Sequence, residues 1–134
     1  MEREILFRGK RVDNGEWIEG NYNLLEIGSN LVPIIIPFQN LVKAMMSDVF
    51  MYQVDLSTVG QFTGLTDKNG VRIFEGDVFK FRSGIYFVEW NNEHSKFLQR
   101  CKQFSRELHI CIAESEIIGN IHDNPELLKG EPNV

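Results

Sequence analysis

This chain of 134 residues is predicted to be a mainly β protein. Short runs of β-branched and aromatic residues recur along it, and glycine-rich turn signals separate these runs. Ten Phe and two Trp supply the large side chains that fill the core of a small β protein. With 43% hydrophobic and 25% charged residues, the composition is that of a folded globular domain.

The first elements are expected to form a β-hairpin. Residues 4–8 are a short apolar run with charged ends, and residues 16–25 resume the strand pattern. The Asp13-Asn14-Gly15 segment between them is a hairpin turn signal, because Asn and Gly accept positive φ angles.

A third strand is predicted at residues 31–36, after a turn at residues 27–30. Pro33 lies inside this run and cannot donate to a ladder, so we expect the strand to lie at a sheet edge or to break there. Residues 39–46 fit a short helix and an exposed loop equally well, and residues 48–54 return to the strand pattern.

The middle of the chain combines turn and strand formers most densely. Strands are expected at residues 61–65 and 71–74, joined by a turn at residues 67–70 whose Asn and Gly tolerate positive φ. Glu75-Gly76-Asp77 forms the next reversal, with the glycine relieving strain that a side chain would create.

A second hairpin is predicted from residues 78–82 and 85–90, joined by a tight turn at Ser83-Gly84. Because successive side chains of a strand point to opposite faces, its first strand has a mixed face and an aromatic face. The mixed face carries Val78, Lys80 and Arg82, and the aromatic face carries Phe79 and Phe81.

Two further strands are expected at residues 96–101 and 108–112. About five short strands at this spacing predict a small SH3-like barrel over residues 75–120. We expect one domain over residues 1–134, and a division into subdomains at residues 1–56 and 57–134 remains an open alternative.

The last predicted element is one turn of helix. Asn124 is an expected N-cap, Pro125 suits the first helical position, and Gly130 follows the end. A single turn is too short to persist alone, so we expect Leu127 and Leu128 to dock on the sheet.

The central segment VGQFTGLTDKNGVRIFEGDVFKF, residues 59–81, closely resembles the signature of the YopX family of phage and prophage proteins. The resemblance extends to residues 3–10 and 15–20 near the amino end, and to residues 118–128 near the carboxyl end. It implies a mainly β protein carried on mobile genetic elements. It brings no catalytic residues with it.

The net charge of −5 and the pI near 5.2 disfavour binding to nucleic acid, whose phosphates attract Lys and Arg. A local basic patch would be needed to offset that charge. The candidate residues form two sets, of which the first is Arg8, Lys10 and Arg11 and the second is Arg100, Lys102 and Arg106.

Cys101 and Cys111 lack the close spacing of a zinc site. We expect two buried thiols in a reducing cytosol, with a disulfide between neighbouring strands as the alternative. The chain shows no leader-like start and no apolar run of about 18 residues, so we expect a cytoplasmic protein, in the host cell of a phage, that does not enter a membrane.

A carboxylate pair and three histidines are the candidates for catalysis or metal binding. Glu75 and Asp77 face the same side of an extended segment, where a carboxylate pair can act in acid–base catalysis or bind a metal, but fixing the turn is the favoured role. His94, His109 and His122 show no catalytic or metal-binding spacing, and His122-Asp123 is expected to be a local turn.

We therefore predict no catalytic, cofactor-binding or metal-binding residue, and no cofactor. The favoured function is non-enzymatic binding of a protein partner or of a second copy, through sheet edges and through Phe38, Met45 and Met46. Two alternatives stay open. One is a small barrel that binds nucleic acid, with Trp17 and Trp90 available for stacking, and the other is an enzyme of unknown reaction.

Overall fold

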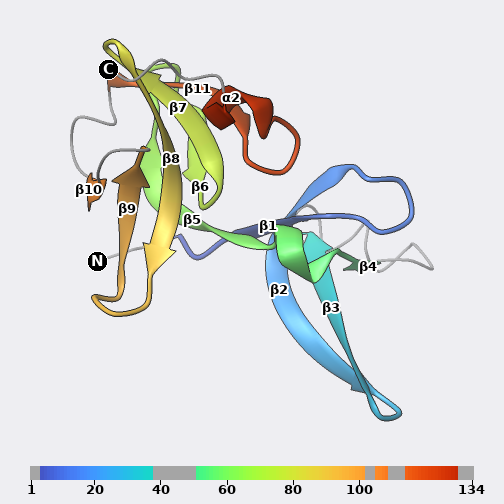
Figure 1. The fold of residues 1–134 in the computed structure, drawn as a ribbon. Helices are drawn as coiled ribbons and strands as arrows, with labels where there is room; N and C mark the ends of the chain where they lie inside the picture. The colour runs from blue at the N-terminus through green and yellow to red at the C-terminus, as the bar shows by residue number, and fades with distance from the viewer. Residues whose placement is uncertain (1–3, 38–50, 102–104, 109–113, 130–134) are drawn as a thin grey trace. The chain divides into compact units, whose positions relative to one another are not determined.

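A computed structural model describes residues 4–37, 51–101, 105–108 and 114–129. The described chain is mainly β, with antiparallel strands and one short α-helix, as predicted (Figure 1). It divides into two compact units, Met1–Gln61 and Phe62–Val134. Strand β5 (Gly60–Thr66) begins in the first unit and ends in the second, and each unit is considered by itself below.

The first unit is a sheet built around two hairpins. Its strands are paired in the order β4-β3-β2-β1-β5, and a 3₁₀ turn, η1 (Leu56–Thr58), precedes β5. The strands that complete it are β1 (Phe7–Lys10), β2 (Trp17–Ile27), β3 (Asn30–Pro37) and β4 (Tyr52–Gln53).

The predicted opening hairpin is confirmed. Strands β1 and β2 are antiparallel, with Phe7 opposite Gly20 and Lys10 opposite Trp17. Gly15 lies in the connecting turn with φ of +73°, and its N–H donates to the carbonyl of Arg11 at 2.9 Å. A glycine is favoured there because a side chain would strain this left-handed backbone.

The prediction for Pro33 is wrong, because β3 is neither broken there nor at a sheet edge. Pro33 lies opposite Leu24 of β2, while the following residues, Ile34 and Ile35, pair with β4 on the other side. The carbonyl of Pro33 accepts a hydrogen bond from the N–H of Val54 at 3.0 Å. The amide and carbonyl of a strand residue point to the same side, so the missing N–H faces the short β4 side and costs the β2–β3 ladder nothing.

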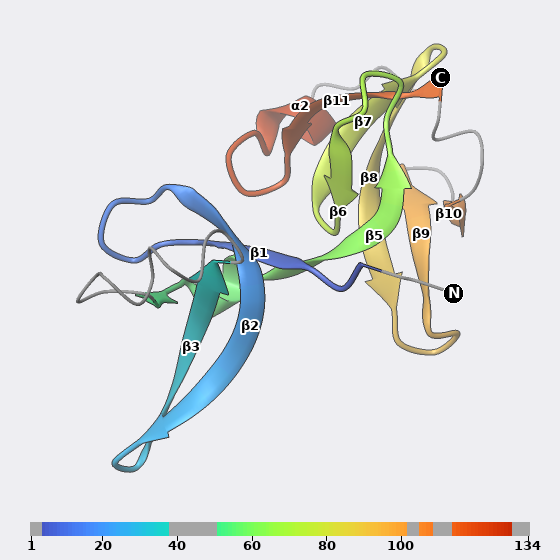
Figure 2. The ribbon, with the colours of Figure 1, turned by 180° about the vertical axis from the view of Figure 1, so that it is seen from behind.

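Strands β2 and β3 form a long hairpin with a two-residue turn, in which Ile27 lies opposite Asn30. Strand β1 pairs with β2 only as far as Gly20, and β4 pairs with β3 only at Ile34 and Ile35. Past those pairs the hairpin continues as a twisted two-stranded ribbon, in blue and cyan in both views (Figures 1 and 2). We call residues 21–32 the arm.

The second unit contains a five-stranded antiparallel sheet in the order β10-β9-β8-β7-β11. Its described ends, β10 and β11, do not pair with each other, so the expected SH3-like barrel is not confirmed. The elements of this unit, besides the end of β5, are β6 (Arg72–Phe74), β7 (Asp77–Phe81), β8 (Gly84–Asn91), β9 (Lys96–Arg100), β10 (Ser105–Glu107), β11 (Glu116–Asn120) and α2 (Glu126–Lys129).

The core of the second unit lies on the aromatic face of β7. Phe79 and Phe81 are buried with Ile73 and Val88, and Tyr86 stacks on Phe79 with ring centres 5.6 Å apart. This face was predicted correctly.

On the opposite face of β7, Val78 is fully buried while Lys80 is exposed. The turn of this hairpin lies one residue earlier than predicted. Phe81 pairs with Gly84, so Arg82 and Ser83 form the loop, and Arg82 takes a φ of +56° that usually favours glycine.

The terminal helix is confirmed as α2, but the side chain of Asn124 bonds to the chain before the helix and not to a helical N–H. The side-chain oxygen of Asn124 accepts a hydrogen bond from the N–H of Asn120 at 3.2 Å, before the helix begins. The carbonyl of Asn124 accepts from Leu127 at 3.1 Å, which closes the first helical turn. Helix α2 contacts strand β8, and Leu127 and Leu128 are half-buried.

Several predictions lie outside the described residues. They concern the segment at residues 39–46, the start of the strand at residues 48–54, most of the strand at residues 108–112, and the residues Phe38, Met45, Met46, Lys102, His109 and Cys111. In the part of the chain that is described, no helix has the length and apolar content to span a bilayer.

Candidate functional site

The side chain of Asp77 stabilises the turn in which it lies. Its side chain is buried, and Oδ2 accepts a hydrogen bond from the N–H of Phe74 at 2.8 Å. Between Asp77 and the half-buried Glu75, Gly76 takes a φ of +92°. The N–H of Gly76 donates to Val88 at 2.9 Å and its carbonyl accepts from Ile121 at 2.8 Å. These bonds give Asp77 and Gly76 the turn-fixing role that the sequence favours.

Asp67 is a buried carboxylate that the sequence analysis did not single out. Its Oδ1 accepts from the N–H groups of Asn69 and Val71, both at 2.9 Å, and its Oδ2 accepts from Ile117 of β11 at 3.0 Å. Burial alone would raise the pKa of Asp67, but the three backbone hydrogen bonds and the charge of Lys68 hold it below its usual range. The ionised group therefore joins the turn at residues 67–70 to a strand 50 residues later.

The described histidines have local partners. The N–H of His94 donates to the side-chain oxygen of Asn91 at 2.8 Å. The N–H of His122 donates to Oδ1 of Asn120 at 3.0 Å, and the amide nitrogen of Asn120 donates to Asp123 at 3.1 Å. Cys101 is partly exposed. Among the described residues no three His, Cys, Asp or Glu side chains are grouped so as to hold a metal ion.

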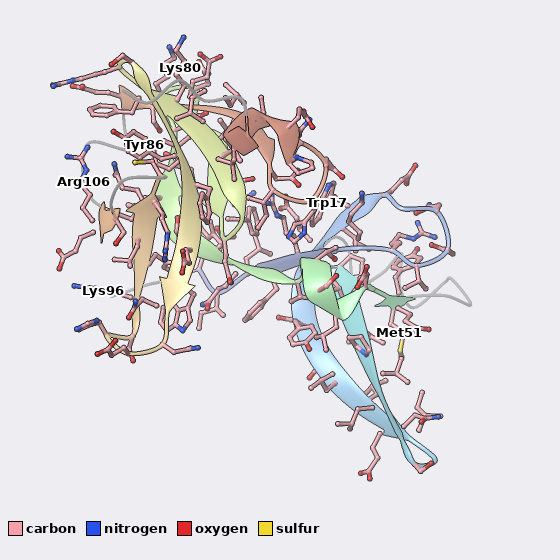
Figure 3. All side chains as sticks on the ribbon, viewed as in Figure 1. Trp17, Met51, Lys80, Tyr86, Lys96 and Arg106 are labelled. Atoms are coloured by element: carbon pink, nitrogen blue, oxygen red, sulfur yellow. The ribbon has the colours of Figure 1, made fainter. Side chains whose placement is uncertain are left out.

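The first basic set lies on and just after β1 against aromatic rings. The Arg8 guanidinium is 4.6 Å from the ring centre of Trp17, and the Lys10 Nζ is 5.7 Å from the same ring (Figure 3 labels Trp17). Arg11 forms an ion pair with Asp13 at 2.6 Å and lies over the ring of Tyr52 at 4.2 Å. The hydrogen bond from Arg11 lowers the pKa of Asp13.

The two described members of the second basic set, Arg100 and Arg106, also contact neighbouring groups. Arg100 donates to both carboxylate oxygens of Glu89 at 3.1 Å. Arg106, labelled with Tyr86 in Figure 3, donates to the amide oxygen of buried Gln99 at 2.9 and 3.1 Å once that amide is oriented for hydrogen bonding. Such local partners reduce the positive field that either set presents to a polyanion.

The arm is the most apolar exposed part of the first unit. Leu24, Ile27 and Leu31 are 48%, 58% and 65% exposed. Glu26 is the only charged side chain among residues 21–32, in a chain where a quarter of the residues are charged. Leu24 and Leu31 lie on one face of the ribbon and Ile27 on the other, because side chains alternate along a strand and Leu31 lies opposite Glu26. Exposed apolar side chains on both faces of a projecting ribbon mark an interaction surface.

Comparison with known proteins settles the family. The model of the YopX protein family matches residues 6–129, which is most of the chain. The chain belongs to the YopX family.

Among solved structures, this YopX protein is similar to the crystal structure of protein EF1440 from Enterococcus faecalis, with a TM-score of 0.57 and 26% sequence identity over 95% of this chain and 99% of that one. No curated protein matches the sequence. Neither the family nor this neighbour brings an activity, so the function is inferred from the surface of the chain itself.

The arm itself was not predicted as a candidate surface. The predicted contacts were sheet edges in general, together with Phe38, Met45 and Met46, and these three residues lie outside the described residues. The signal that was present is the scarcity of charge from residue 21 to residue 32. What the sequence did not show is where the flanking strands stop, which decides that these residues are exposed.

Proposed function

We propose that this YopX-family protein is a non-enzymatic protein-binding module that uses the arm as its contact surface. The observation that carries the proposal is the exposure of Leu24, Ile27 and Leu31 on a ribbon with one charge. Burying such side chains against a partner removes apolar area from water, at roughly 25 cal/mol per Å². As the resemblance to phage and prophage proteins implies, the partner would be met in the cytoplasm of a host cell.

Binding to nucleic acid is the less favoured alternative. It draws on Arg8 and Lys10 beside Trp17, where a cation and an aromatic ring share one face of β1 and β2. The net charge of −5 and the ion pairs of Arg11 and Arg100 count against it. We expect binding to generic duplex DNA no tighter than about 10⁻⁴ M at physiological salt, the weak end of non-specific affinity.

An enzymatic function is the third alternative. Of the candidate pair Glu75 and Asp77, Asp77 accepts a backbone hydrogen bond from Phe74. The buried Asp67 likewise accepts one from Ile117. Groups held this way keep a turn in place and have less freedom to exchange protons with a substrate. A non-enzymatic role therefore fits them better.

A photo-crosslinking experiment tests the proposed function. A benzophenone amino acid replaces Ile27 on the arm or, as a matched control, Val71, whose side chain is 49% exposed in the second unit. Each variant is irradiated in lysate of the bacterial host. We expect protein adducts from position 27 at several times the yield from position 71.

Equal adduct yields at the two positions, or adducts made mainly to nucleic acid, would contradict the proposal. The adducts formed at position 27 are then identified by mass spectrometry. The experiment accepts either a different protein or a second copy of this chain as the partner.

A further inference from the structure

The turn of the hairpin determines which residues of β2 direct their backbone N–H and C=O groups toward β3 and which direct them outward. In a hairpin with a two-residue turn, the pair flanking the turn is hydrogen-bonded, and such pairs alternate along the ladder. Here that pair is Ile27 with Asn30. Tyr22, Leu24 and Glu26 therefore direct their N–H and C=O groups away from β3.

Pro33 independently supports this assignment of outward-directed residues. It lies opposite Leu24, and its carbonyl is bonded to Val54 on the far side of β3. The backbone of Leu24 must then also point away from β3, because directly opposite residues of an antiparallel pair share the same bonding state. The turn and Pro33 therefore both place the N–H and C=O groups of Leu24 on the outer side of β2.

No described strand satisfies these outward groups. Strand β1 ends its pairing with β2 where Phe7 lies opposite Gly20, two residues before Tyr22. The next outward residues are thus left as a strand edge, and their exposed N–H and C=O groups are a template for another strand.

Glu26 is the one charged side chain on the edge of β2, which otherwise lacks the usual protection against pairing. Residues 21–27 contain no Lys, Arg or Pro, and their register with β3 runs without a bulge. Strand β11, at an end of the sheet in the second unit, differs because its register with β7 shifts between Ile117 and Gly119. Such a bulge twists an edge away from further pairing.

We propose that the β2 edge of the arm pairs antiparallel with the same edge of a second copy, with the two-fold axis at Leu24. This inference rests on the proposed function and names the partner. In this register Leu24 lies opposite its own equivalent, and Tyr22 lies opposite Glu26. All three outward residues find a partner, so the two ribbons join into a four-stranded sheet.

Charge and existing pairing disfavour two of the alternative registers. A two-fold axis at Glu26 would place two carboxylates directly opposite each other, which is destabilising. A register shifted toward β1 would require the backbone of Gly20, which already pairs with Phe7. With the axis at Leu24, the one charged side chain of the arm faces the Tyr22 hydroxyl instead, which can donate a hydrogen bond to it.

A charge-swap experiment on the full chain tests the inference. The oligomeric state of the wild type, Leu24→Lys, Leu24→Glu and an equimolar mixture of the two variants is measured by sedimentation velocity across a concentration series. We expect a wild-type dimer. Each variant alone should raise the dissociation constant by at least about tenfold, because position 24 faces itself, and the mixture should recover the dimer through a Lys–Glu pair.

Leu31→Lys and Leu31→Glu are the matched controls. Leu31 is the more exposed leucine of the arm, but it lies on β3, away from the edge that pairs. Their mixture should associate no better than either variant alone. Far-ultraviolet circular dichroism should show that all four variants keep the β fold.

Three outcomes would overturn the inference. They are a wild type that stays monomeric at every concentration, a dimer that Leu24→Lys does not weaken, and weakened variants that fail to recover when mixed. If a monomeric wild type still gives adducts of a different protein at position 27, only the choice of partner is wrong. If position 27 gives no protein adducts at all, the proposed function fails as well.

Discussion

The protein contains two hairpins of the same design with different surroundings. Both β2–β3 and β7–β8 are joined by two-residue loops. Strand β7 is paired on its other side with β11, and β8 with β9. The β2–β3 hairpin has flanking strands only near its base, at β1 and β4.

This difference in edge pairing accompanies a difference in side-chain burial. In the second hairpin Phe79, Phe81 and Val88 are buried, whereas in the first Leu24 and Ile27 are exposed. Both hairpins therefore have similar local strand propensity, and this propensity does not determine which hairpin has buried side chains. The neighbouring strands decide it, and the hairpin without them is the one available for binding.

The largest effect is expected from truncating the core of the paired hairpin. Phe79→Ala should lower the free energy of unfolding by about 3–5 kcal/mol, because it removes a buried ring that stacks on Tyr86. Leu24→Ala, on the arm, should change it by less than about 0.5 kcal/mol when measured on dilute protein. Urea unfolding followed by circular dichroism checks both. Comparable losses from the two variants would remove the distinction between the hairpins.

The buried carboxylate in the second unit should give the next largest effect. Asp67→Asn should cost about 1.5–3 kcal/mol, because the two carboxylate oxygens accept bonds from three N–H groups and the amide of asparagine keeps only one, uncharged acceptor oxygen. Unfolding in urea at neutral pH measures this loss.

The same substitution predicts a pH dependence. The folded-state pKa of Asp67 lies below its ordinary value of 3.8, so the ionised group stabilises the protein fully above that pH. Its contribution is lost as the pH falls through the lower folded-state pKa. The stability difference between wild type and Asp67→Asn should stay constant above pH 3.8 and narrow below it. A difference that stays flat well below pH 3.8 would show that folding does not lower the pKa of Asp67.

Two glycines with positive φ sharpen the comparison further. An added Cβ on Gly76 would lie 3.5 Å from Nε2 of His122, whereas on Gly28, in the turn of the arm, it would meet nothing within 4 Å. Gly76→Val should therefore cost about 1–3 kcal/mol through strain and crowding, and Gly28→Val should cost less because only strain applies. Thermal melting of the two variants ranks them. An unchanged midpoint for Gly76→Val would show that this turn does not need its glycine.

The smallest predicted loss concerns the segment before α2. Asn124→Ala should cost about 1 kcal/mol, because it removes the acceptor of the Asn120 N–H. Asn23→Ala, an exposed asparagine on the arm, is the control and should leave the melting midpoint unchanged. Equal behaviour of the two variants would mean that the bond to Asn120 contributes nothing.

The local turns could be predicted from the sequence because their signals are local. Gly15, Gly28 and Gly76 all take positive φ at the predicted reversals. The turn of the second hairpin was misplaced by one residue because Arg82, and not a glycine, takes the positive φ. The pairing of Phe81 with Gly84 stabilises the left-handed backbone of Arg82. This pairing could not be predicted from the residue types.

The non-local features could not be predicted. The third hydrogen bond of Asp67 comes from Ile117, and no spacing rule connects those positions. The same limit applies to closure of the expected barrel, which depends on whether β10 and β11 meet. For the candidate surface, the scarcity of charge around Glu26 was visible in the sequence, but exposure of the arm depends on where β1 stops pairing.

Hydrogen exchange of individual backbone amides tests the central claim most directly. In dilute protein the N–H groups of Tyr22, Leu24 and Glu26 should exchange rapidly, while those of the β7–β8 hairpin are protected. As the concentration rises, these three amides should gain protection together, because the second copy pairs with them. Rapid exchange of the three amides at every concentration, with the rest of the sheet protected, would contradict the account.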